Sequence, residues 1–205
     1  MAIMDRKEKV FVVKNISHLK ENLMFLSKSK ENVILLDSNS KKNDYEFIFS
    51  YGKISELKSS DNSLEKLDNY INQVNDWIFG FISYDLKDEI EDLKSKNLKY
   101  FDVPNLSFFQ PSTIWIFDGV VLKALYFDEK ELLEDWSEIN KIHTRFDKNK
   151  SNSKVELKGR LSKEEYVKKI KNIKNRIKMG DTYELNFCFD FFNDNTKTVS
   201  YTHLR

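Results

Sequence analysis

Acidic side chains are most concentrated in one short segment, DLKDEIEDL, which runs from Asp85 to Leu93 and carries five carboxylates. Carboxylate oxygens can bind a hard cation, and a pair of carboxyl groups can act as general acid and general base. Apolar residues recur in the same segment at Leu86, Ile90 and Leu93, which is the spacing of one face of an amphipathic helix. The carboxylates then form the solvated face of that helix, and we assign no metal or catalytic site to them.

Basic side chains are concentrated on a second segment, and a basic amphipathic helix can bind nucleic acid or a membrane surface. These residues lie opposite an apolar stripe of Val167, Ile170, Ile173 and Ile177. A solvated outer face explains this arrangement, so we expect neither a nucleic-acid nor a membrane partner. The basic residues are Lys168, Lys169, Lys171, Lys174, Arg176 and Lys178.

Nucleophiles and metal ligands are few. A single cysteine, Cys188, cannot form an internal disulfide, and without a visible neighbouring base we expect it to be a small core residue. The three histidines, His18, His143 and His203, are too scattered for a structural zinc site, which needs about four close ligands. The sequence also lacks the glycine-rich phosphate-binding motifs, the G-x-S-x-G nucleophile motif and the H-E-x-x-H zinc motif.

Composition places these segments in a folded protein. Of the 205 residues, 40% are hydrophobic and 14% aromatic, which excludes general disorder. Lys and Arg number 34 against 33 Asp and Glu, so the net charge of +1 gives no bulk attraction for nucleic acid or anionic lipid. No stretch approaches about 18 consecutive apolar residues, and the N-terminus lacks the pattern of a signal peptide. We therefore expect a soluble, cytoplasmic protein.

Strand-like and helix-like patterns alternate along residues 1–146 and predict one domain there. The pair Asp118-Gly119 is the strongest hairpin signal of the chain, and Asp128 is placed to cap a helix that ends near Phe146. The run WIFGFISY predicts a central strand in which Gly80 marks a bulge or a close approach of other backbone. The remaining expected strands are Val10–Val13, Val33–Leu36 and Tyr45–Tyr51, and the remaining helices carry Leu19, Leu23 and Leu26 or Leu64, Leu67, Ile71 and Val74.

The rest of the chain begins with a polar stretch, residues 147–160, which has the composition of a linker. A capping box of Ser162 and Glu165, with Gly180 as the C-terminal cap, predicts a helix over Lys163–Met179. The alternation that follows predicts a strand from Asp181 to Phe192 with both faces at least partly covered. Helices combined with a mixed or antiparallel sheet indicate an α+β fold.

Three segments resemble the chorismate-binding family, which includes the large subunits of anthranilate synthase and para-aminobenzoate synthase. The first is residues 162–192, in which a helix ending at Gly180-Asp181 is followed by a strand with Tyr183 and Asn186 at the family's spacing. The second, ILLDS at residues 34–38, is similar to the family's Leu-Leu-Glu/Asp-Ser signature. The third, GFISYDLKDEIEDL at residues 80–93, is similar to a segment typical of the aminodeoxychorismate (para-aminobenzoate) synthase component I branch.

The resemblance implies an enzyme that aminates chorismate at C4 on the route to folate, with ammonia from a glutamine amidotransferase subunit and with magnesium as cofactor. Anthranilate synthase component I is the closest alternative, and a non-catalytic module that binds tryptophan or another protein is the alternative outside enzymes. The resemblance also implies an N-terminal domain of the anthranilate synthase component I type over residues 1–146 and the start of the chorismate-binding domain over 161–192. It assigns no catalytic residue, because those of the family are expected beyond residue 205, so we expect this fragment to be inactive. We expect its tail, residues 193–205, to be atypical, and our hypothesis is that the tail is artefactual.

One ligand site is implied by the resemblance. The segment Leu36, Asp37 and Ser38 matches the part of the family that lines a tryptophan pocket, and Tyr45 or Phe47 would form a wall for the indole. A carboxylate suits the ammonium group of an amino acid, and a hydroxyl suits its polar atoms. The other interpretation is that Asp37 and Ser38 only end a strand, since both residue types favour turns.

The aromatic strand carries one further expectation. If residues 181–192 lack the neighbouring strands of a complete domain, their rings have no sheet to pack against. We therefore expect exposed aromatic surface at Phe187, Phe189, Phe191 and Phe192.

Overall fold

The computed structural model describes residues 5–13, 16–39, 44–91, 101–141 and 156–193. The chain divides into two compact units, Met1–Phe146 and Asp147–Arg205, and each is described by itself. The division falls where the predicted linker begins. Most of that linker, residues 147–155, lies outside the described residues, as do residues 194–205 of the expected tail.

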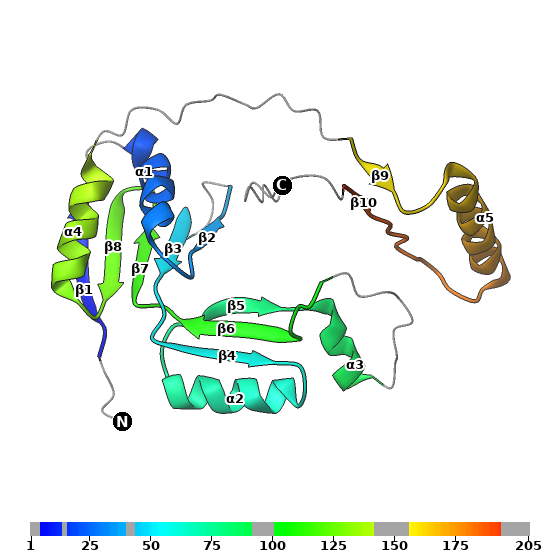
Figure 1. Ribbon diagram of the computed structural model, residues 1–205, viewed down its shortest axis with the longest axis horizontal. Helices are drawn as coiled ribbons and strands as arrows, with labels where there is room; N and C mark the ends of the chain where they lie inside the picture. Colours follow the sequence, from blue (N-terminus) through cyan, green and yellow to red (C-terminus); the bar gives the residue numbers. More distant parts are fainter. Residues whose placement is uncertain (1–4, 14–15, 40–43, 92–100, 142–155, 194–205) are drawn as a thin grey trace. The chain divides into compact units, whose positions relative to one another are not determined.

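The first unit contains a five-stranded antiparallel sheet in the order β1-β8-β7-β3-β2 (Figure 1). The Asp118-Gly119 pair joins β7 to β8 as predicted, and Gly119 has a φ of +100°, a backbone conformation that favours glycine. The strands are β1 (Lys7–Val12), β2 (Ile34–Asp37), β3 (Phe47–Tyr51), β7 (Thr113–Phe117) and β8 (Val121–Tyr126).

One face of this sheet carries the main core. Alternation along β3 and β7 turns Phe47, Phe49 and Trp115 to the same side, where each is almost completely buried. This face packs with α1 (Leu19–Leu26) and α4 (Glu129–Asn140), whose apolar stripes include Leu23 and Leu132. The predicted stripe of α1 is confirmed, as is the predicted cap of α4, because the Asp128 carboxylate accepts hydrogen bonds from the backbone N–H groups of Lys130 and Glu131. Short 3-10 helices at Ile16–His18 (η1) and Ser27–Ser29 (η2) flank α1.

A smaller three-stranded sheet in the order β4-β6-β5 completes the strands of this unit, with α2 (Ser63–Val74) running beside β4 (Figure 1). Its strands are β4 (Ser55–Ser59), β5 (Phe79–Ile82) and β6 (Leu106–Gln110). The prediction that the WIFGFISY strand is central was wrong: β5 is an edge strand, and Phe81 and Ile82 are about half exposed. The close approach predicted at Gly80 is confirmed, since a Cβ there would lie 2.0 Å from the Ser107 carbonyl oxygen.

The acidic segment contributes to this smaller sheet through one carboxylate. It forms the 3-10 helix η3 (Tyr84–Leu86) and the short helix α3 (Lys87–Ile90), and residues 92–93 lie outside the described part. Glu89 accepts hydrogen bonds of 2.6 Å from the backbone N–H and the hydroxyl of Ser63 and from the Asn105 amide. Asn62 provides no side-chain cap for α2. Glu89, which is distant in sequence, instead accepts the hydrogen bond of the Ser63 backbone N–H at the N-terminus of this helix.

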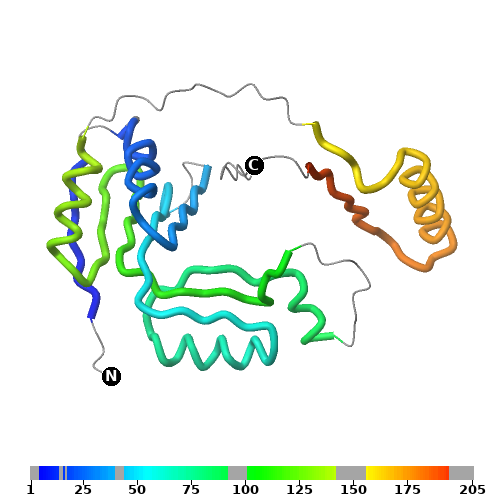
Figure 2. Tube along the Cα trace, viewed as in Figure 1, coloured from blue at the N-terminus to red at the C-terminus, as the bar shows by residue number. Residues whose placement is uncertain are grey.

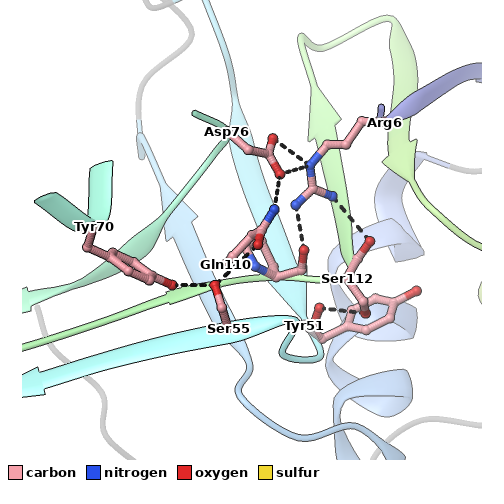
Figure 3. A network of polar contacts seen from close by, with 8 residues as sticks. Arg6, Tyr51, Ser55, Tyr70, Asp76, Gln110 and Ser112 are labelled. Atoms are coloured by element: carbon pink, nitrogen blue, oxygen red, sulfur yellow. Dashed lines mark hydrogen bonds and ion pairs between the residues drawn. The ribbon is translucent and has the colours of Figure 1, made fainter. Parts of the chain in front are cut away.

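A buried polar network joins the two sheets (Figure 3). The Arg6 Nε lies 2.7 Å from both carboxylate oxygens of Asp76, and the guanidinium also donates to the carbonyls of Pro111 and Ser112, where the chain passes from β6 to β7. The Gln110 amide donates to Asp76 at 2.8 Å. Burial would raise the pKa of Asp76, but these hydrogen bonds outweigh it and hold the pKa below its ordinary value. The ion pair therefore fixes the corner between the sheets.

The described part of the second unit, residues 156–193, contains α5 (Lys163–Met179) and the two short paired strands β9 (Lys158–Gly159) and β10 (Phe191–Phe192), as Figure 2 traces. The predicted bounds of α5 are confirmed, together with the capping box of Ser162 and Glu165 and the left-handed C-cap at Gly180. Both residues of β9 lie within the predicted linker, residues 147–160.

The predicted strand over residues 181–192 was mostly wrong. Only β10 pairs, and Tyr183 is 96% exposed instead of lying on a covered face. Alternation alone cannot form a strand, because a strand needs a partner for its backbone hydrogen bonds. The expected aromatic exposure is found at Phe189 and Phe191, whereas Phe187 and Phe192 are half-buried.

Candidate functional site

A cavity of about 540 Å³ lies at the end of the β2–β3 pair in the first unit. All five residues of the expected ligand site line it, together with Asp44 and Ile48, which sequence reasoning missed. Leu36 and Asp37 are the last residues of β2, Phe47 is the first residue of β3, and Ser38 and Tyr45 lie just outside the strands. The structure therefore brings the five residues to one place, where two antiparallel strands end together.

The strand register divides these residues between the faces of the sheet. Asp37 pairs with Phe47, and Leu36 pairs with Ile48. Because neighbouring residues of a strand point to opposite faces, Asp37 and Phe47 lie on the face that packs against α1, and Leu36 and Ile48 lie on the other. The cavity thus extends around the end of the edge strand and has polar groups on one side and aliphatic groups on the other.

Asp37 is part of an ion pair that was not anticipated. Lys20 of α1 places its Nζ 3.0 Å from Oδ2 of Asp37 and 3.3 Å from Oε1 of Glu46, and the Asn39 backbone N–H donates to Oδ1 of Asp37 at 3.0 Å. The Asn39 hydrogen bond, supported by Lys20, lowers the pKa of Asp37 below its ordinary value despite partial burial. Asp37 is therefore ionised at neutral pH, with an ammonium group already beside it.

Ser38 forms two hydrogen bonds directly after the end of β2. Its backbone N–H and its hydroxyl both donate to the Glu46 carbonyl oxygen at 3.0 Å. This supports the interpretation that Asp37 and Ser38 end a strand. The two interpretations are compatible, because the strand ends at the cavity.

The two candidate indole walls differ. Phe47 is 1% exposed, and its ring packs against that of Phe117 with centroids 5.3 Å apart in the core. Tyr45 is 46% exposed. Tyr45 is therefore the aromatic ring that a ligand in this cavity can contact.

Lys20 pairs with the lining residue Asp37 but does not itself line the cavity, and this pairing could not be identified from the sequence. Burial would lower its pKa, but the hydrogen bonds to Asp37 and Glu46 raise it above the ordinary value. It lies 17 positions before Asp37, on the helix that packs against the sheet, and only tertiary structure brings the two together.

Magnesium, which the resemblance implies, is bound in proteins through oxygen ligands that include one or two carboxylates. Among residues 5–13, 16–39, 44–91, 101–141 and 156–193, no three His, Cys, Asp or Glu side chains come together in a metal-binding arrangement.

Cys188 and His18 are not among the residues that line the cavity. Cys188 is exposed, so the prediction of a core cysteine was wrong, because the strand that would have covered it is not formed. His18 is exposed and lies 3.1 Å from a Glu21 carboxylate oxygen. His143 and His203 lie outside the described residues.

Comparison with known proteins identifies a family. A family model described as chorismate binding enzyme matches residues 19–205. No curated protein sequence matches the chain significantly. In the part of the chain that the structure describes, none of the helices combines the length and the apolar character needed to cross a bilayer.

Proposed function

The chain belongs to the family of chorismate binding enzymes, and from this premise we propose that it is part of a synthase that aminates chorismate. The proposed type is aminodeoxychorismate synthase component I, which adds ammonia from a glutamine amidotransferase partner to C4 of chorismate. The segment Gly80–Leu93 supports this branch over anthranilate synthase, because its sequence is similar to a segment typical of it. Magnesium, which would neutralise the carboxylate of chorismate, belongs to the proposed enzyme and not to the described residues.

Within this enzyme we propose that the first unit binds tryptophan in the cavity at the end of the β2–β3 pair. The observation that carries the proposal is that Leu36, Asp37, Ser38, Tyr45 and Phe47 line one cavity of about 540 Å³. This volume falls within the range of about 300–1,000 Å³ that is usual for small-molecule sites.

The side chains offer complementary groups for each part of an amino acid. Asp37 can pair with the ammonium group, and Lys20, which is 37% exposed, can pair with the carboxylate. The indole can contact the exposed Tyr45 ring and the aliphatic side chains of Leu36 and Ile48. The Lys20–Asp37 pair would thus open into two contacts with a zwitterion, which keeps both charges paired.

Calorimetry with L-tryptophan tests this proposal. We expect micromolar binding, and Asp37→Ala should weaken it by at least about tenfold, because the ligand ammonium loses its charged partner. Asp61→Ala is the matched control, since Asp61 forms a similar ion pair with Lys66 but does not line the cavity. Absence of binding heat in the unchanged protein, or an equal loss of tryptophan affinity in both variants, would overturn the tryptophan site. Asp37 and Ser38 would then be strand-ending residues only.

Lys20→Met tests the other half of the pair. We expect weaker binding of tryptophan and little change for tryptamine, which has no carboxylate. An equal loss for the two ligands would show that Lys20 contributes only to the local structure of the site.

The reaction branch is tested by product analysis. Supplied with chorismate, ammonium and magnesium, the enzyme that contains this chain is expected to form 4-amino-4-deoxychorismate without releasing pyruvate. Formation of anthranilate with pyruvate would assign the other branch. The 205-residue polypeptide alone is expected to form neither product, since the resemblance assigns no catalytic residue to it.

A further inference from the structure

A second cavity of about 520 Å³ lies on the face of the five-stranded sheet that points away from α1 and α4. Its floor is aliphatic and includes Ile116 of β7 and Leu125 of β8. Its lining also includes Trp77, which follows α2. Only Asp44 and Tyr45 also line the first cavity, so the two cavities adjoin but have different floors.

The charged groups of this second cavity are unbalanced. Four carboxylates and two cations line it. Both cations are already paired, Arg6 with Asp76 at 2.7 Å and Lys123 with Glu8 at 3.1 Å. The other two lining carboxylates are Asp44 and Asp118, and neither forms an ion pair within the described part of the chain.

Asp118 is held in place and kept ionised by backbone groups. Its Oδ1 accepts hydrogen bonds of 2.8 Å from the backbone N–H groups of Val121 and Val120. These two hydrogen bonds lower the pKa of Asp118 below its ordinary value. Both of these hydrogen bonds reach Oδ1, so the hairpin turn fixes the carboxylate without using Oδ2, an atom that can accept from another group.

Aromatic rings provide the second half of the recognition chemistry. Trp77 is 39% exposed and Tyr45 is 46% exposed, and both line the cavity. The face of an aromatic ring attracts a cation, most strongly for tryptophan, and a neighbouring carboxylate adds a charge-assisted hydrogen bond. An anion would meet an excess of negative charge, and a fully polar cation would leave the aliphatic floor without a partner.

We propose that this second cavity binds a small organic cation, an ammonium group carried on a flat apolar body. Asp118 and Asp44 pair with the ammonium, and Trp77, Tyr45 and the floor contact the apolar body. This site goes beyond the proposed chorismate chemistry and does not depend on it, because it rests on the charge and shape of a different cavity.

Titration with phenethylammonium, followed by tryptophan fluorescence, tests the site. Trp77 is the exposed indole, whereas Trp115 is fully buried and Trp136 is partly buried in the main core. We expect a saturable change with phenethylammonium and affinity at least about tenfold weaker for the uncharged phenethyl alcohol. Phenylacetate, which carries a negative charge on a similar body, should not bind. Equal affinity for the cation and the alcohol, or no saturable change, would overturn the proposal.

Variants locate the bound probe. Asp118→Asn keeps a side-chain oxygen for the hairpin turn but removes the negative charge. We therefore expect the affinity for phenethylammonium to fall about fivefold or more and the affinity for phenethyl alcohol to stay unchanged. Asp68→Asn on α2 is the matched control, because it removes one negative charge outside the cavity. An equal effect of the two variants would reduce the binding to general electrostatic attraction and overturn the site.

Asp37→Ala separates the two cavities, since Asp37 lines only the first. We expect it to leave phenethylammonium affinity unchanged, and loss of binding in this variant would assign the cation to the first cavity and overturn the proposal. Trp77→Phe, followed by calorimetry, keeps the test independent of fluorescence. This variant should bind phenethylammonium more weakly but still measurably, because the phenylalanine ring attracts a cation less strongly than the tryptophan ring does.

Discussion

The two units of this chain differ in how much of their structure is held by contacts between distant residues. In the first unit, Trp115, Phe49 and Leu23 are completely buried between a sheet and two helices. No described residue of the second unit is buried, although α5 is the longest helix of the structure described. The comparison shows that a helix can be specified by local signals, whereas a strand and a binding cavity need partners from elsewhere in the chain.

This difference has a consequence for function. The proposed tryptophan site depends on Lys20, Asp37 and Tyr45, which come from a helix, a strand and a loop end held together by the first unit's core. The described part of the second unit offers exposed rings at Tyr183 and Phe191 but no comparable core behind them. Both proposed ligand cavities lie in the first unit, and the predictions below test whether the two units differ as described.

The largest expected effect is the loss of a core ring. Trp115→Ala should reduce the free energy of unfolding of the first unit by about 3–5 kcal/mol, because it leaves a large cavity and removes the hydrogen bond from Nε1 to the Tyr51 hydroxyl. Tyr183→Ala is the matched change in the second unit, where the side chain is 96% exposed, and it should cost less than about 0.5 kcal/mol. Denaturant unfolding measures both, and similar costs would contradict the contrast between the units.

A smaller effect is expected at alkaline pH from the buried Tyr51. Its hydroxyl donates to the Asp135 carboxylate, which also pairs with Lys30 at 2.9 Å. Burial, with the negative charge of Asp135, raises the pKa of Tyr51 far above its ordinary value. Above about pH 10 the unfolded chain loses this proton while the folded state keeps it, so the free energy of unfolding should fall by up to about 1.4 kcal/mol per pH unit.

Tyr51→Phe checks this dependence, because it removes the titrating group and keeps the ring. The alkaline loss of stability should become smaller in this variant, although Lys30, whose pKa is also raised, contributes a loss of the same sign. An unchanged slope between pH 10 and 12 would show that Tyr51 titrates in the folded state and is not shielded as described.

The smallest effect compares the same cap in both units. Ser162→Ala removes the side-chain acceptor at the N-terminus of α5. It should reduce the stability of this helix by about 1 kcal/mol, which faster amide exchange in residues 163–168 would report. Asp128→Ala removes the equivalent acceptor from α4, but Leu132 and Ile139 hold that helix in the core. We expect its amide exchange to stay slow while global stability falls by about 1 kcal/mol. Equal fraying of both helices would remove the distinction between local and tertiary stabilisation.

Local chemistry explains what the sequence could predict. The capping box of Ser162 and Glu165, the glycine at Gly180 and the Asp118-Gly119 turn each act within a few residues, and all appear as predicted. The strand β4 was not anticipated, because its sequence SELKS is polar and it forms only by pairing with β6. The edge position of β5 was missed for a related reason, since an apolar run does not reveal how many neighbours the strand will have.

The same limit applies to the cavities. The resemblance pointed to Leu36, Asp37 and Ser38, but no local pattern links Lys20 to Asp37 or Trp77 to Asp118. Such groups meet only after the sheet and its helices have packed. Tertiary packing also determines which charged side chains form ion pairs. Neither the Lys20–Asp37 pair nor the surplus carboxylates of the second cavity could therefore be predicted from the sequence.

Hydrogen-exchange mass spectrometry of the whole chain with and without L-tryptophan tests the central claim most directly. The proposed site predicts slower exchange on adding tryptophan in the segments around Leu36–Ser38 and Asp44–Ile48, and no change in α5 or residues 181–192. Protection confined to the second unit, or no protection at saturating tryptophan, would contradict the proposal that the first unit holds the amino acid at the end of β2 and β3.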